Sequence, residues 1–174
     1  VVVCDFDDTT AMENVAEMLL EEFGSSEWKS FRKSHQKNEI SLMKYQELAF
    51  GTVSADKDTL KEFVRKTATL RDGFKTLFEF CRSENIPIVI ASLGLDFYIE
   101  ALLEKEGLET IPYFAADTTF TEEGIEYVCD RCNDDQPYVM KVKSGRLVSV
   151  PYTLEINDIP IYLIQIHWIP QSLH

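Results

Sequence analysis

The chain opens with a short apolar run that leads directly into acidic residues. The run covers residues 1–4, and Asp5 and Asp7 follow it two positions apart. A continuous apolar run of this length predicts a strand that is buried on both faces of a parallel sheet. In open α/β sheets the carboxyl ends of the strands form the ligand-binding edge. The sequence therefore predicts an α/β fold in which both carboxylates lie at a binding site.

The two carboxylates suit phosphoryl transfer through a covalent intermediate. Asp5 can attack an electrophilic phosphorus, while Asp7 protonates the leaving oxygen and later activates water. Neighbouring carboxylates repel unless a cation neutralises them, and Mg²⁺ prefers one or two carboxylates together with phosphate and water. We therefore expect Asp5 and Asp7 to bind Mg²⁺. The alternative is a polar loop in which Thr9 or Thr10 caps a helix that begins near Met12.

A second buried strand is predicted at residues 87–91, and it ends at Ser92. An amphipathic helix is predicted to follow it and to run through about Glu106. Backbone N–H groups at such a helix start favour anions. The alternative for Ser92 is that its side chain caps this helix.

The DFDDT segment, residues 5–9, resembles the first signature of the haloacid dehalogenase-like hydrolases, DxDx(T/V). The resemblance implies that Asp5 is the nucleophile, that Asp7 is the acid/base residue and that Thr9 positions Asp7 and belongs to the phosphate-binding residues. Asp8 occupies a place where the family more often has Gly, but this place is variable. The implied reaction is hydrolysis of a phosphomonoester through an aspartyl-phosphate.

The family's second motif is a Ser or Thr that binds the transferring phosphoryl group. Ser92 matches this motif, and the resemblance implies that Leu93 and Gly94 bind the phosphate with it. The wider stretch 86–99 is similar to the phosphoserine phosphatase-like branch. It is closer still to methionine-salvage phosphatases that act on a phosphorylated methylthio-pentenyl sugar derivative.

Residues 11–71 show helical periodicity, with breaks at 24–26, 38–41 and 51–54. The last break places Ser54 or Asp56 where it can cap the next helix. The resemblance implies that this segment is a helical-bundle cap inserted into a Rossmann-like core of residues 1–10 and 72–132. Caps exclude water and select substrates. Four polar residues of this segment could reach a substrate: Glu13, Asn14, Arg32 and Lys44. For each of them, a solvated helix face is the commoner place.

The sequence after Glu106 predicts a third parallel strand at 112–116 and a hairpin at 119–128. A phosphatase of this family also needs a Lys and a further acid-bearing strand, and neither occurs in good context. The methionine-salvage branch has a Cys-rich stretch that ends in Lys-Pro, and here Gln136 takes the place of that Lys. The alternative function is therefore a catalytically impaired or inactive domain that binds phosphate or a partner.

Residues 133–174 form an atypical tail. Its first part resembles an internal stretch of polysaccharide deacetylase and allantoinase-type proteins, without their metal-binding motifs. In the family's sheet the missing acid-bearing strand lies beside the first strand, so its loss would expose an apolar edge. Residues 147–150 and 159–169 are strand-prone and could fill this gap. The tail carboxylates that could replace the missing metal ligand are Asp135, Glu155 and Asp158.

The composition limits the partners. The formal net charge is −13, which argues against nucleic acid or an anionic membrane, since phosphate backbones need clustered Lys and Arg. We expect a small phosphorylated metabolite as substrate. The sequence shows no secretory signal or membrane span, and the expected location is the cytoplasm. The oligomeric state stays open.

Overall fold

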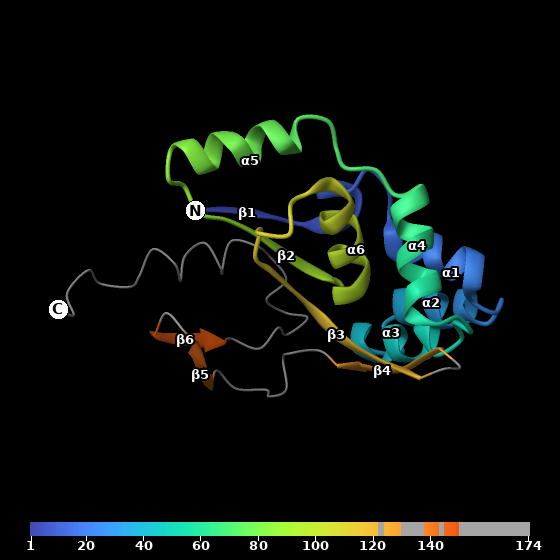
Figure 1. Cartoon of the computed structure of the whole chain (residues 1–174). Coiled ribbons are helices and arrows are strands. Elements are labelled where there is room, and N and C mark those ends of the chain that lie inside the picture. Colours follow the sequence, from blue (N-terminus) through green and yellow to red (C-terminus); the bar gives the residue numbers. More distant parts are fainter. Residues whose placement is uncertain (122–123, 130–137, 143–144, 150–174) are drawn as a thin grey trace. The chain divides into compact units, whose positions relative to one another are not determined.

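A four-stranded sheet carries both predicted motifs (Figure 1). The computed structural model describes residues 1–121, 124–129, 138–142 and 145–149. Its described strands follow the order β1-β2-β3-β4. The strands are β1 Val2–Cys4, β2 Ile88–Leu95, β3 Tyr113–Thr121 and β4 Gly124–Cys129. The first three are parallel and β4 is antiparallel to β3, which confirms the mixed α/β fold with a mainly parallel sheet.

Strand β2 is longer than the sequence predicts. We expected it to end at Ala91, but it continues to Leu95, with a register shift against β3 between these two residues. The extension follows from burial, because Leu95 is fully buried and pairs with Ala116. Residues 92–94 therefore lie in an irregular final part of the strand, a kind of feature that often occurs beside binding sites.

Strand β1 pairs only with β2 among the described strands, so it forms an edge of the described sheet. Its residues Val2, Val3 and Cys4 are partly exposed among the described residues, and the gap beside this strand stays a prediction. The candidate segment 159–169 lies outside the described residues. The candidate at 147–150 contributes to β6 Gly145–Ser149, which pairs with β5 Tyr138–Val142 in a separate antiparallel hairpin.

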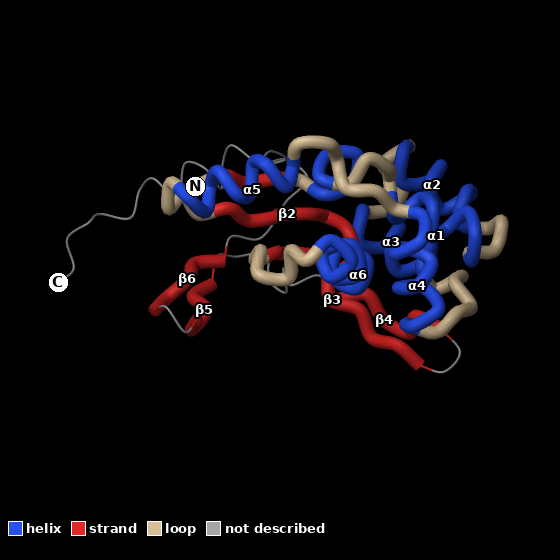
Figure 2. The backbone as a smooth tube through the Cα atoms, turned by 45° about the horizontal axis from the view of Figure 1, so that its top comes forward, coloured by secondary structure: helices blue, strands red, loops and turns tan. Residues whose placement is uncertain are grey.

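Four helices occupy the segment that was predicted to be helical. They are α1 Val15–Phe23, α2 Trp28–Gln36, α3 Leu42–Phe50 and α4 Lys57–Thr67. The side chains of Asn14, Ser41 and Asp56 each accept a hydrogen bond from the backbone N–H three residues further on. These caps explain why three of the helices begin where they do. Figures 1 and 2 show the four helices gathered at the end of the sheet toward which β1 and β2 run.

Helix α1 begins at Val15, whereas the alternative interpretation of residues 5–10 as a polar loop predicted a helix that begins near Met12. Its cap is Asn14, so neither Thr9 nor Thr10 caps a helix that begins near Met12. Those two threonines belong instead to η1 Phe6–Thr10, a single wide turn after β1. The predicted cap at Asp56 is confirmed.

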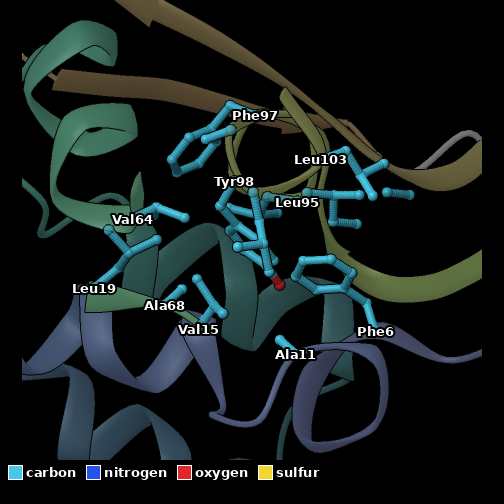
Figure 3. Packing of buried hydrophobic residues seen from close by; sticks show 14 of the residues in the cluster. Phe6, Ala11, Val15, Leu19, Val64, Ala68, Leu95, Phe97, Tyr98 and Leu103 are labelled. Carbon is cyan, nitrogen blue, oxygen red and sulfur yellow. The ribbon is translucent and has the colours of Figure 1, made fainter. Parts of the chain in front are cut away.

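Helix α6 Asp96–Glu106 forms the centre of the core and is largely buried, whereas the sequence predicted an amphipathic helix. Six of its eleven residues are buried, among them Phe97, Tyr98 and Leu103 (Figure 3). Its polar side faces α4, where Lys61 Nζ lies 3.0 Å from a carboxylate oxygen of Glu100 and 3.1 Å from one of Glu104. Helix α5 Phe74–Ser83 precedes β2. No helix in the described part of the chain is long and apolar enough to cross a membrane.

Candidate active site

The site lies at the carboxyl ends of β1 and β2. Cys4 pairs with Ile90 in the parallel register, so Asp5 leaves the sheet on the edge where Ser92 also lies. The chain then turns through η1, in which the N–H and the hydroxyl of Thr10 both donate to the carbonyl of Asp5. Thr10 is buried, so this turn is tied firmly to the end of β1. The two predicted motifs therefore meet at one edge of the sheet.

Asp5 has one carboxylate oxygen engaged and one open. Thr9 Oγ1 donates to Asp5 Oδ2 over 3.1 Å, and Asp5 Oδ1 accepts no hydrogen bond from the described residues. The resemblance implied that Thr9 positions Asp7, but the hydroxyl contacts Asp5 instead. The reason is the wide turn, which brings the fourth residue after Asp5 back over it. Asp5 is thus oriented with one oxygen available for a ligand.

Asp7 is held by three donors. Its Oδ1 accepts from the backbone N–H groups of Val15, over 2.7 Å, and Ala16, over 3.3 Å, at the start of α1. Its Oδ2 accepts from the hydroxyl of Tyr98 over 2.7 Å. Burial raises the pKa of Asp7 above its ordinary value, and these hydrogen bonds oppose that rise only in part. Burial and the charge of Asp7 also raise the pKa of Tyr98 well above its ordinary value.

Asp8 adopts the left-handed conformation that favours glycine. Its φ is 58°, which explains why the family more often has Gly at this place. Two side chains support the turn there: Asn14 Nδ2 donates to Asp8 Oδ2 over 3.0 Å, and the guanidinium of Arg71 donates to the carbonyls of Asp8 and Thr9. Arg71 was not among the predicted site residues. The one feature of the sequence that could have indicated its role is its position at the end of the helical segment, where the chain returns to the core.

Ser92, Leu93 and Gly94 form a short loop-like end to β2. Ser92 Oγ accepts from the N–H of Gly94 over 3.0 Å, and α6 begins four residues after Ser92 without a side-chain cap. Ser92 is therefore not the cap of this helix. Leu93 is half-exposed, and its carbonyl accepts a hydrogen bond from the side chain of Gln46 in α3. The helical segment thus reaches directly to the end of β2.

Gly94 is required by a close approach. A Cβ at this position would lie 1.8 Å from the hydroxyl oxygen of Tyr98 and 2.9 Å from Oδ2 of Asp7. Both contacts are far shorter than normal van der Waals separations, so only glycine fits beside the Asp7–Tyr98 pair. The second motif therefore packs directly against the acid of the first motif.

Two curated proteins that are similar to this chain are named as phosphatases. The 2-hydroxy-3-keto-5-methylthiopentenyl-1-phosphate phosphatase of Bacillus velezensis is 30% identical over 155 residues, which cover 83% of this chain and 66% of that protein. The protein of the same name from Lysinibacillus sphaericus is 32% identical over 108 residues, 62% of this chain and 47% of that protein. No family model matches the chain.

The same fold occurs in solved structures. A HAD family hydrolase from Salmonella enterica serovar Typhi has a TM-score of 0.61 at 18% identity, over 71% of this chain and 42% of that one. A phospho-aspartyl intermediate analogue of phosphoserine phosphatase has a TM-score of 0.59 at 16% identity, over 75% and 63% of the two chains. This chain belongs to the haloacid dehalogenase-like phosphatase family. It spans about two thirds of the Bacillus velezensis protein and 57% of the Brevibacillus brevis protein of the same name.

The metal ligands that this family fold implies are present only in part among the described residues. No group of three His, Cys, Asp or Glu side chains there could hold a metal ion. Asp5 offers an open oxygen, whereas Asp7 has a single unused lone pair, on Oδ2, once its three hydrogen bonds are counted. Mg²⁺ commonly binds through one or two carboxylates with substrate phosphate and water, so Asp5 fits as one ligand. The tail candidates Asp135, Glu155 and Asp158 and the Lys-replacing Gln136 lie outside the described residues.

The four polar residues of the helical segment that could reach a substrate all have partners within that segment or beside it. The pairs are Glu13 with Thr69, Asn14 with Asp8, Arg32 with Glu17 at 2.6 Å and Lys44 with Glu47 at 3.0 Å. Gln46, which was not among the predicted residues, donates a hydrogen bond from this segment to the second motif.

Replacement of Asp7 by Asn is expected to stabilise the fold at neutral pH. The pKa of Asp7 is higher in the folded chain than its ordinary value of 3.8, so protonated Asp7 favours the folded state. This contribution to the free energy of unfolding is fully present below pH 3.8 and is lost as the pH rises through the folded-state pKa. Asn keeps the acceptor for Val15 and Ala16 and can donate to Tyr98. Urea unfolding with a chelator present should show similar stabilities at acid pH and a more stable variant at pH 7. A variant that is less stable at pH 7 would contradict this assignment.

Proposed function

We propose that this chain is a phosphatase that hydrolyses a phosphomonoester of a small metabolite through an aspartyl-phosphate on Asp5. One observation carries the proposal: the open Oδ1 of Asp5 lies at the same sheet edge as Ser92, beside an Asp7 that three donors hold in place. A nucleophile, a proton carrier and an anion site at one edge are the groups that this chemistry needs.

The proposed reaction has two halves. Asp5 Oδ1 forms a bond to phosphorus as the bond to the leaving oxygen breaks, and Asp7 gives its proton to that oxygen. Asp7 then takes a proton from water, which attacks phosphorus and restores the carboxylate of Asp5 with release of inorganic phosphate. Ser92 and the backbone of Leu93 and Gly94 hold the phosphoryl oxygens in this proposal, and the N–H of Gly94 exchanges Ser92 Oγ for the phosphate as its acceptor. Thr9 orients Asp5 for the attack.

We assign Asp5 as a ligand of Mg²⁺, which would neutralise charge between the nucleophile and the substrate phosphate. Oδ2 keeps one lone pair beside the hydrogen bond from Thr9, so a metal could be held there while Oδ1 stays free to attack. A metal role for Asp7 would use the same lone pair of Oδ2 that carries its proton, so the two roles compete. The identity of the metal as Mg²⁺ and its further ligands are part of this proposal.

Residues 11–71 act in this proposal as a cap over a core of residues 1–10 and 72–132. The hydrogen bond from Gln46 to the carbonyl of Leu93 and the ion pairs of Lys61 with α6 support it, since they join the helical segment to the site. The net charge of −13 disfavours polyanions as substrates, and the Bacillus velezensis relative is named for 2-hydroxy-3-keto-5-methylthiopentenyl-1-phosphate. We infer a small phosphorylated metabolite of the cytoplasm as substrate.

The test is turnover of p-nitrophenyl phosphate with Mg²⁺ by the native chain and by Asp5→Asn. Metal-dependent turnover that this substitution abolishes supports the proposal. Equal background in both proteins contradicts it and favours the second candidate, a domain that binds phosphate without hydrolysis. That candidate draws on the absence of a three-ligand metal group among the described residues.

A further inference from the structure

Tyr98 is the one side-chain partner of Asp7 among the described residues. Its hydroxyl donates to Oδ2 over 2.7 Å, and the tyrosine is fully buried although it bears this polar group. The two residues lie on different elements, Asp7 in η1 and Tyr98 in α6. The contact joins the first motif to the helix that follows the second motif.

The hydrogen bonds of Asp7 determine where its proton can be carried. Two N–H groups, of Val15 and Ala16, point at Oδ1 and occupy both of its lone pairs. Among the described residues, Oδ2 accepts from Tyr98 alone and so keeps one lone pair. Oδ2 is therefore the oxygen that can give a proton to a leaving group, and Tyr98 fixes the orientation of that oxygen.

The packing around Tyr98 holds its hydroxyl in place. Between ring centroids, Tyr98 lies 5.8 Å from Phe6 and 5.6 Å from Phe97. The backbone of Gly94 packs so closely against the hydroxyl that a larger residue would not fit at position 94. Figure 3 shows the ring among the core side chains, with its oxygen directed toward the segment of Phe6 and Ala11. Tyr98 has no exposed surface, so its hydroxyl does not contact solvent directly.

We propose that Tyr98 is a positioning residue that aligns Oδ2 of Asp7 for proton transfer to the leaving group. This inference rests on the proposed function, in which Asp7 is the acid/base residue. It assigns a specific task to a tyrosine outside both motifs. Its consequence is that loss of the hydroxyl should matter most when the leaving group needs a proton.

The test compares two esters that differ in this need. An alkoxide leaving group, as in glycerol 2-phosphate, requires protonation, whereas p-nitrophenolate leaves readily without it. With Mg²⁺ present, Tyr98→Phe should lower kcat/KM for glycerol 2-phosphate about tenfold and that for p-nitrophenyl phosphate less than about twofold. The parameter kcat/KM covers steps only through departure of the leaving group, so breakdown of the intermediate does not enter.

The ratio of the two kcat/KM values is independent of how much of the variant is correctly folded, because both esters meet the same active fraction. Tyr45→Phe serves as the matched control, since its ring stacks on His35 within the helical segment, and it should leave the ratio unchanged. Equal losses on both esters in Tyr98→Phe would overturn the inference and leave the proposed function standing. Turnover that Asp5→Asn does not abolish would overturn both.

Discussion

Asp5→Asn is expected to lower turnover of p-nitrophenyl phosphate by at least about a thousandfold, to the background of the buffer with Mg²⁺. The amide of Asn cannot form the aspartyl-phosphate, although it keeps an acceptor for the hydroxyl of Thr9. Asp5 is partly exposed at the end of β1, so the substitution should leave the melting temperature nearly unchanged.

Asp58→Asn is the matched control for this experiment. Asp58 is an exposed residue in the first turn of α4 and contacts neither motif. The control removes the same charge from the chain, so it should retain native turnover. An Asp5→Asn protein that keeps more than a tenth of native turnover would show that another group attacks the phosphate.

Gly94→Ala is expected to lower the free energy of unfolding by about 2–3 kcal/mol, the upper part of the usual range for overpacking. The added Cβ would meet the hydroxyl of Tyr98 at 1.8 Å, and this ring is fully buried and cannot swing into solvent. Movement of Tyr98 would also displace Asp7, so activity should fall together with stability. Urea unfolding measures the first effect and p-nitrophenyl phosphate turnover the second.

The double variant Gly94→Ala/Tyr98→Phe checks the cause. It lacks the oxygen of the shortest contact, although the Cζ atom of residue 98 would still lie 2.7 Å from the new Cβ. The two substitutions should therefore destabilise the fold by less than the sum of their separate effects. Strict additivity would show that the Tyr98 hydroxyl is not what excludes a side chain at Gly94.

The sequence was informative where the signal is local. The apolar run before Asp5 and the one before Ser92 predicted two strands, and parallel pairing brings their carboxyl ends together without further information. The four helices between them were visible because turn and capping residues, such as Asp56, interrupt the periodic pattern.

Contacts between distant residues could not be predicted in this way. Asp7 accepts hydrogen bonds from the N–H of Val15, which is eight residues later in the chain, and from Tyr98, which is ninety-one residues later. Capping rules apply to partners two or three residues apart, so they predict neither contact. The partner of Thr9 differed from expectation because the conformation of the wide turn is set by Thr10 and the β1 end together. The end of β2 was misplaced because burial of Leu95, a tertiary effect, extends the strand beyond Ser92.

The central claim is that Asp5 carries the phosphoryl group during turnover, and mass spectrometry of acid-quenched reactions tests it most directly. Native chain and Asp7→Asn would be mixed with p-nitrophenyl phosphate and Mg²⁺, quenched and digested. The account predicts a phosphorylated peptide that contains Asp5, more abundant in Asp7→Asn, because that variant can still expel p-nitrophenolate but cannot activate water. Steady turnover by the native chain with no phosphorylation of Asp5 in either protein would contradict it.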